Sequence, residues 1–260
     1  MLRAVLFLAV TGCISLGPMP ASTGVSVMPA NRTHAEVSAA TIPGSRLSSA
    51  ATDDDRNGYA VPQLAALFDP DKLLPIRGVF VSVRGFGDDD TGVEPIIGYR
   101  RRSGSVAYML AAYGTKMGYD DSTEDDDGDF VSYDMTRAGA EGGLGYMLAD
   151  TKWVRAHAQA TVAATLIAAD GSYCIDTEGR AIRCQGSMDN RVDGELTGVY
   201  TTASASVALE LGPQAGNFHG VRLSAMLAGG HMPRLVGGQQ RTGDAFIAFG
   251  LGVAVGFGAE

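Results

Sequence analysis

The stretch Ala245–Phe257, with the sequence AFIAFGLGVAVGF, decides the fold class of this chain. Bulky apolar residues occupy most of its odd-numbered positions, and glycine or alanine occupies most of its even-numbered positions. This period of two predicts a β-strand, because successive side chains of a strand point to opposite faces. Neither face carries a charge, whereas a soluble barrel would have a polar outer face. We therefore expect the bulky face to contact lipid and the small face to line a filled interior.

Seven further segments alternate in the same way and are separated by turn signals. Several exceed the ~9–11 residues that a tilted strand needs to cross a bilayer. The eight predicted strands span residues 77–86, 93–102, 105–118, 130–148, 152–169, 195–211, 218–231 and 244–258. Their connections are alternately long and short, so that short turns lie at one end of the fold and long loops at the other. This arrangement is typical of bacterial outer-membrane barrels.

Over about residues 77–258 the chain resembles the small eight-stranded outer-membrane β-barrel proteins of bacteria. The resemblance rests on the strand count, on the asymmetry of the loops and on the last strand, Phe249-x-Leu251-x-Val253-x-Val255-x-Phe257, which is similar to the C-terminal assembly signal of that family. It implies an all-β, antiparallel, up-and-down transmembrane barrel of about eight strands over residues 76–258. The rival interpretation is a periplasmic or lipid-anchored soluble β protein.

The N-terminal part predicts export and then a linker. Residues 1–21 have a positive start and a compact apolar run, the pattern of a signal peptide. Val10–Cys13 resembles a lipobox in which Cys13 is lipidated; the alternative is ordinary cleavage between Ala21 and Gly24, which removes Cys13. Residues 22–75 are rich in Ser, Thr, Ala, Pro and Gly, which predicts a disordered linker with one short helix over Pro62–Leu74.

Charge composition bears on the partners. The formal net charge is -9, with 20 Lys and Arg against 29 Asp and Glu, and this argues against a nucleic-acid binder. Seven acidic residues lie in the loop after the third predicted strand: Asp120, Asp121, Glu124, Asp125, Asp126, Asp127 and Asp129. Such a run is ordinarily a solvated loop, and the alternative is calcium binding or a bridge through divalent cations to lipopolysaccharide phosphates. Outer-membrane lipid is the expected partner, and the sequence leaves the oligomeric state open.

Alternation places several charged residues on the inward face of the predicted barrel. The expected lumen network comprises Arg137, Glu141, Arg155, Glu210 and Arg222. Buried charges must pair, so we expect Glu141 to lie within reach of at least one of these arginines. The simplest interpretation is structural plugging, because side chains just fill an eight-stranded barrel. The alternative is a gate or a narrow polar conduit.

The sequence contains no nucleophile-elbow motif, HExxH pair or P-loop. We therefore predict no enzyme activity, no cofactor and no metal site; the enzyme alternative is an outer-membrane hydrolase or acyltransferase. The predicted role is an outer-membrane barrel with acidic surface loops that serves envelope structure or surface interaction. A small channel for polar solutes is the alternative role. Candidates for the aromatic girdles are Tyr99, Tyr108, Tyr113, Tyr146, Trp153 and Tyr200, and the alternative for some of them is a place in the core.

The two cysteines of the predicted barrel, Cys174 and Cys184, should form a disulfide, because an even pair in an oxidising compartment is most simply bridged. The closed loop is short, so the bridge should stabilise the protein by only ~2–3 kcal/mol. Thiol labelling of the unreduced mature protein should find neither cysteine free. Stoichiometric labelling of both residues would contradict the pairing.

Overall fold

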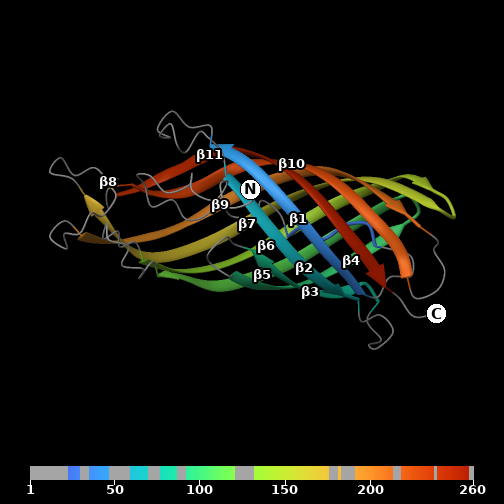
Figure 1. The fold of residues 1–260 in the computed structure, drawn as a ribbon, viewed down its shortest axis with the longest axis horizontal. Coiled ribbons are helices and arrows are strands. Elements are labelled where there is room, and N and C mark those ends of the chain that lie inside the picture. Colours follow the sequence, from blue (N-terminus) through green and yellow to red (C-terminus); the bar gives the residue numbers. More distant parts are fainter. Residues whose placement is uncertain are drawn as a thin grey trace, which may run out of the picture.

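The computed structural model of the chain describes residues 23–29, 35–46, 59–69, 77–86, 92–120, 132–175, 181–182, 191–212, 218–236 and 239–257. These residues form a closed antiparallel β-barrel (Figure 1). The strands are β1 (Ala35–Arg46), β2 (Tyr59–Phe68), β3 (Val79–Phe86), β4 (Gly92–Ser103), β5 (Val106–Asp120), β6 (Ser132–Asp150), β7 (Val154–Ile175), β8 (Ala181–Ile182), β9 (Arg191–Leu211), β10 (Phe218–Val236) and β11 (Gln239–Phe257).

Each strand of the wall pairs with its neighbours in the sequence, and the pairing of β1 with β11 closes the barrel. The short strand β8 pairs only with the far end of β7, so ten of the eleven described strands form the wall. Because the number is even, β1 begins and β11 ends at the same end of the barrel, where Ala35 lies opposite Phe257. The tight turn between β4 and β5 lies at this end and contains Gly104 with a φ of 62°, a left-handed conformation that favours glycine.

All eight predicted strands are present, but the prediction of about eight strands is wrong because β1 and β2 add two more. Both lie in the stretch predicted to be a disordered linker, and β2 replaces much of the predicted helix. Each of the two strands contains a proline, Pro43 or Pro62, which lacks a backbone N–H and usually argues against a strand within a sheet. The barrel therefore begins at Ala35 rather than at residue 76. The predicted signal peptide lies outside the described residues.

The outer face of the wall is apolar over a limited height. Large exposed side chains cover it, among them Leu110, Leu144, Val162, Leu166, Val199, Val207, Leu227 and Leu251. On β5 and β6 this belt begins near Tyr108 and Tyr146 and ends at the exposed pair Lys116 and Asp134, whose charged atoms are 3.9 Å apart. The interval is about ten residues, the length of a strand segment that crosses a bilayer. The bulky face of β11 points outward as predicted, with Phe249 and Leu251 about half exposed.

The girdle prediction is correct for only part of its set. Tyr108, Tyr146 and Trp153 are exposed near the short turns, and Tyr99 lies beside Tyr108 with the ring centroids 6.1 Å apart. The remaining two candidates, Tyr113 and Tyr200, are buried inside the barrel, so their assignment to a girdle is wrong. Residue type alone suggested them, whereas the alternation of their strands turns both side chains inward. Among the described residues, no helix has the length and apolarity that a membrane span requires.

An arginine in the middle of the outer belt tests whether this face contacts lipid. Ala160 on β7 lies opposite Leu144 within the belt, so Ala160→Arg should destabilise a membrane barrel by ~2–4 kcal/mol. Thr136→Arg on β6 is the matched control at the edge of the belt, where the expected cost is ~0–1 kcal/mol. Denaturant titration of both variants in lipid vesicles measures the difference. Equal stability of the two variants would show that this face does not contact hydrocarbon.

Candidate functional site

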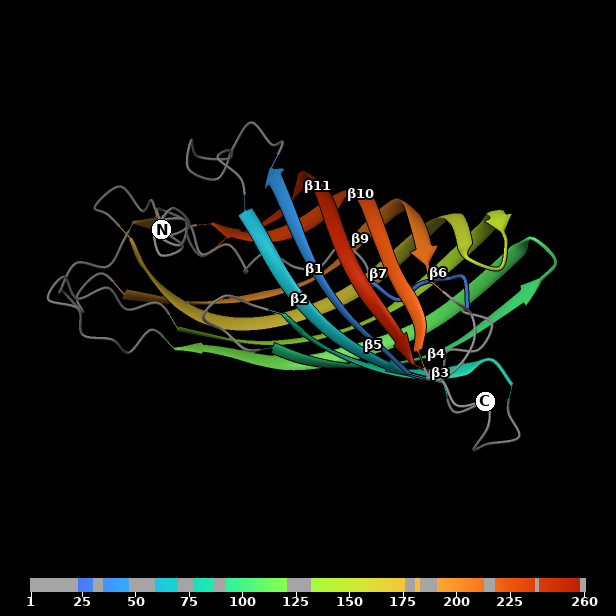
Figure 2. The same cartoon turned by 45° about the vertical axis from the view of Figure 1, so that its right-hand side comes forward.

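The lumen contains a segment of the chain itself, Thr23–Pro29, which we call the plug segment. Figure 2 shows it as a blue trace inside the barrel, toward the end with the short turns. Its residues Thr23, Val25, Ser26, Val27 and Met28 are all buried. The segment lies in the stretch predicted to be a disordered linker, and that prediction is wrong here as well. Its sequence has no clear periodicity, so no local signal distinguished it from a linker.

Side chains of the wall bind the backbone of the plug segment at four points. The Thr23 N–H donates to Glu141 Oε2 at 2.6 Å, and the Val27 N–H donates to Gln159 Oε1 at 2.9 Å. Arg100 Nη1 donates to the Ser26 carbonyl at 3.0 Å, and Arg155 Nη2 donates to the Pro29 carbonyl at 3.4 Å. The segment has no strand partner in the wall, so these side chains provide hydrogen bonds that its buried backbone otherwise lacks.

The apolar side chains of the plug segment complete a hydrophobic core inside the lumen. Val25, Val27 and Met28 pack with inward residues of β2 to β6: Leu67, Phe80, Ile96, Ala107, Met109, Ala111, Tyr113 and Met147. Val27 lies against two inward glycines of β6. A Cβ atom at Gly143 would come within 2.6 Å of Val27 Cγ2, and one at Gly145 within 3.4 Å of Val27 Cγ1. The two glycines therefore make a slot in the wall that Val27 fills.

Deeper in the lumen, one carboxylate binds two arginines. Glu94 on β4 accepts hydrogen bonds from Arg84 Nε on β3 at 2.7 Å and from Arg137 Nε on β6 at 2.8 Å. All three side chains are almost fully buried. The Arg84 guanidinium also lies over the ring of Tyr113 at 5.7 Å, and the Tyr113 hydroxyl is 2.6 Å from Thr165 Oγ1. These groups bring together β3, β4, β5, β6 and β7 across the interior.

A second series of ion pairs follows the inner wall near the short turns. Arg155 on β7 binds Glu210 on β9 at 2.8 Å and approaches Asp150 at 3.4 Å. Arg222 on β10 binds Glu36 on β1 at 2.7 Å and lies 3.9 Å from Glu210. Arg102 on β4 extends the series by binding Asp150 at 2.8 Å. Six charged residues thus link strands from β4 around to β1 by way of β6, β7, β9 and β10.

The structure places all five predicted lumen residues inside, in three different settings. Arg137 belongs to the Glu94 cluster, and Arg155, Glu210 and Arg222 belong to the series near the turns. Glu141 is 1% exposed and binds the plug segment, while its neighbour on the opposite face, Leu144, is 65% exposed.

Several charged residues of the lumen were missed. Arg84, Glu94 and Arg100 lie in predicted strands, and the alternation of those strands would have turned them inward. Alternation gave no indication for Glu36, because Glu36 lies in the stretch that was predicted to be a disordered linker.

Other predicted sites lie partly outside the described residues. Cys13 and Cys184 fall outside them, and Cys174 is described only through its backbone pairing with Ile182 and Arg191. The disulfide and the lipidation therefore stay predictions. Most of the acidic run after β5 also lies outside. Within the part of the chain that the structure describes, no three His, Cys, Asp or Glu side chains are grouped to hold a metal ion.

One serine–histidine contact bears on the enzyme alternative. Ser26 Oγ lies 3.3 Å from His157 Nε2 in the lumen. No described group hydrogen-bonds the other ring nitrogen of His157, Nδ1, so the orienting acid of a catalytic triad is missing from the described residues. Ser26 Oγ also donates to the Met28 carbonyl at 3.1 Å. The contact therefore resembles a structural hydrogen bond of the plug segment more than a nucleophile and its base.

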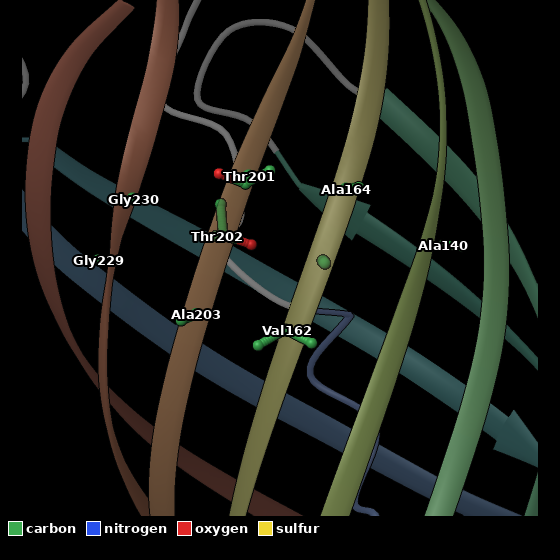
Figure 3. Close-up of a pocket in the computed structure, with 9 residues that line it drawn as sticks. Ala140, Val162, Ala164, Thr201, Thr202, Ala203, Gly229 and Gly230 are labelled. Atoms are coloured by element: carbon green, nitrogen blue, oxygen red, sulfur yellow. The ribbon is translucent and has the colours of Figure 1, made fainter.

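The wall also has an open hollow on its outer side (Figure 3). It is lined by Ala140, Val162, Ala163, Ala164, Thr201, Thr202, Ala203, Gly229 and Gly230. Its position is where β9 and β10 part, since their pairing ends at Thr202 and Gly230. The lining residues carry no charge, and the Thr201 and Thr202 hydroxyls are the polar side-chain groups among them.

Comparison with known proteins finds similarity to solved structures only. No protein-family model matches the chain, and no curated protein matches it. Neisserial surface protein A is similar with a TM-score of 0.36 at 14% identity, covering 86% of this chain and 97% of that one. The attachment invasion locus protein Ail of Yersinia pestis is similar with a TM-score of 0.34 at 8% identity, and the match covers 87% of this chain and 99% of that one. The translocator domain of the autotransporter NalP from Neisseria meningitidis is similar with a TM-score of 0.46 at 11% identity, and the match covers 87% of this chain and 90% of that one. Similarities this weak carry no argument about function, which has to come from the chain's own geometry.

The Glu94 cluster predicts a large stability effect. Glu94→Gln removes the charge that balances two buried guanidinium groups, so it should lower the free energy of unfolding by ~3–5 kcal/mol. Asp134→Asn is the matched control, because it breaks an exposed pair and should cost only ~0–1 kcal/mol. Guanidinium titration in detergent micelles measures both values. A loss at Glu94 no greater than the control would mean that the cluster is solvated rather than buried.

Proposed function

We propose that this protein is a non-enzymatic barrel of the bacterial outer membrane with a closed lumen and a role in envelope structure or surface interaction. The observation that carries the proposal is the distribution of polarity across the wall. The outer face is apolar over about the height of a bilayer, and the buried arginines and glutamates and the plug segment lie inside. A soluble barrel would require the reverse arrangement.

The filled lumen supports a role that does not depend on a permanent open pore. The plug segment and the Glu94 cluster occupy the interior at successive depths, and their side chains are buried. The predicted alternative, a channel for polar solutes, would require the plug segment to leave. With a filled lumen, interactions with other molecules would take place at the surfaces of the barrel, chiefly at the long connections opposite the short turns.

The long connections are the proposed surface of interaction. Those after β5 and β7 leave the barrel at the end opposite Trp153 and the short turns. We place this end outside the cell, because outer-membrane barrels have short periplasmic turns and longer extracellular loops. The acidic run within residues 119–129 would then face the medium, where divalent cations could bridge it to lipopolysaccharide phosphates.

Cysteine accessibility tests both location and orientation, in a background with Cys174 and Cys184 replaced by serine. A membrane-impermeant maleimide should label Asp134→Cys in intact cells, because Asp134 is exposed above the apolar belt. The matched variant Ser105→Cys, in the short turn between β4 and β5, should be labelled only after the outer membrane is permeabilised. The opposite pattern would reverse the orientation, and recovery of the protein in the soluble fraction would contradict the proposal.

A further inference from the structure

We propose that the lumen contains a binding site for a short peptide, and that the plug segment, whose backbone bends at Val27 and Met28, is its resident ligand. The proposal requires a membrane barrel with a filled lumen, but it does not depend on the surface role proposed above. Its starting point is the chemistry of the contacts. Side chains of the wall bind the backbone of the plug segment, as the side chains of a receptor bind a peptide ligand.

Four hydrogen bonds of the wall bind the backbone of the plug segment, and the Ser26 hydroxyl adds side-chain contacts with His157 at 3.3 Å and with Gln159 at 3.4 Å. Glu141 and Gln159 accept from two N–H groups, and Arg100 and Arg155 donate to two carbonyls. These backbone groups exist in every peptide except at proline nitrogens, so the four contacts select a backbone path, while the φ of 72° at Gly24 favours glycine at that position. The four contacts alternate in kind along the segment, with donors of the wall facing carbonyls and acceptors facing N–H groups.

Shape provides the selectivity that these hydrogen bonds lack. Val27 fills the slot above Gly143 and Gly145 on β6, where a Cβ at Gly143 would collide with it and a Cβ at Gly145 would lie in van der Waals contact. Val25 and Met28 enter the hydrophobic core formed by β2 to β6. The site should therefore accept a short peptide with small or apolar side chains that can adopt this bent path. It should reject a bulky residue at the position of Val27.

The wall side of the site would remain in place without its ligand. Arg155 is bound by Glu210, and Arg100 binds Asp69 at 3.1 Å, so both guanidinium groups keep an ion pair when the plug segment leaves. The barrel strands do not pair with the segment. A vacated site would be a polar passage lined by Arg100, Glu141, Arg155, His157 and Gln159 that opens toward the short turns.

The decisive experiment releases the plug segment after the barrel has folded. A protease recognition sequence is inserted between Pro29 and Ala35, again with Cys174 and Cys184 replaced by serine. Val27→Cys and Gly145→Cys are added to hold the segment; a Cβ at Gly145 would lie 3.5 Å from Val27 Cβ, within the ~3.5–4.5 Å that a disulfide spans. Heat-modifiability on a gel confirms a folded barrel before and after cleavage, which keeps a failure of the membrane fold distinct from a failure of this proposal.

Planar-bilayer conductance then reports the state of the lumen. The cleaved, oxidised protein should be silent, and unitary currents should appear only after reduction and washing release the fragment. An acetylated and amidated peptide of residues 23–29, added at ~1 mM, the order of concentration that a short tether imposes, should abolish these currents. The Thr23→Ala peptide should block equally, because Glu141 binds the backbone N–H. A peptide N-methylated at Val27 should not block, because it cannot donate to Gln159.

Each other outcome overturns part of the proposal. A barrel that stays silent after the fragment has been recovered in the wash would show that the Glu94 cluster closes the lumen by itself, and this would contradict the proposed passage. Unitary currents that persist after the peptide of residues 23–29 has been added would show that the lumen has no peptide site. Equal block by the N-methylated peptide would refute recognition of the backbone. A fragment that neither leaves nor exchanges for labelled peptide would show a permanent structural element instead of a ligand.

Discussion

The barrel depends on the pairing of buried guanidinium groups with carboxylates in its interior. The outer face is apolar, and the buried charged residues point inward, where water is largely excluded. An unpaired charge there would cost several kcal/mol, so each arginine needs a partner on another strand. Glu94 satisfies two arginines at once, and the series near the short turns alternates basic and acidic groups from β4 to β1. The polar interior therefore helps to specify which strands lie opposite each other.

Small residues on the inner wall make these pairs and the plug segment possible. Arg222 on β10 reaches Glu36 on β1 across β11, which lies between them. The inward residues of β11 at this level are Ala254 and Gly256, so no side chain blocks the path. The glycines of β6 play the same role for Val27. Bulky residues at these positions would fill the space locally, but they would separate the charges and exclude the segment.

The alternation of side-chain types along the sequence predicted most strands and the faces on which their side chains lie. It did not predict which side chains of different strands contact each other. The uncharged pattern of Ala245–Phe257 correctly indicated an outward bulky face and an inward small face. The same parity placed Glu141 inside and Leu144 outside, because the bulge of β6 lies further along, between Met147 and Ala149. Which arginine Glu141 or Glu94 meets depends on strands distant in the sequence. The sequence did not predict β1, β2 or the plug segment, because prolines and small residues interrupt the alternation that indicates a strand.

The two main errors of the sequence-based prediction have one physical connection. Side chains alone just fill an eight-stranded barrel, and the diameter grows roughly in proportion to the number of strands. Adding β1 and β2 therefore creates space that inward side chains of ordinary length do not fill. The residues immediately before β1 occupy that space, with Val25, Val27 and Met28 completing the core and wall side chains satisfying their backbone. The stretch taken as linker thus supplies both the extra strands and the material that fills the wider interior. A barrel of this chain without the plug segment would therefore have a passage where the segment now lies.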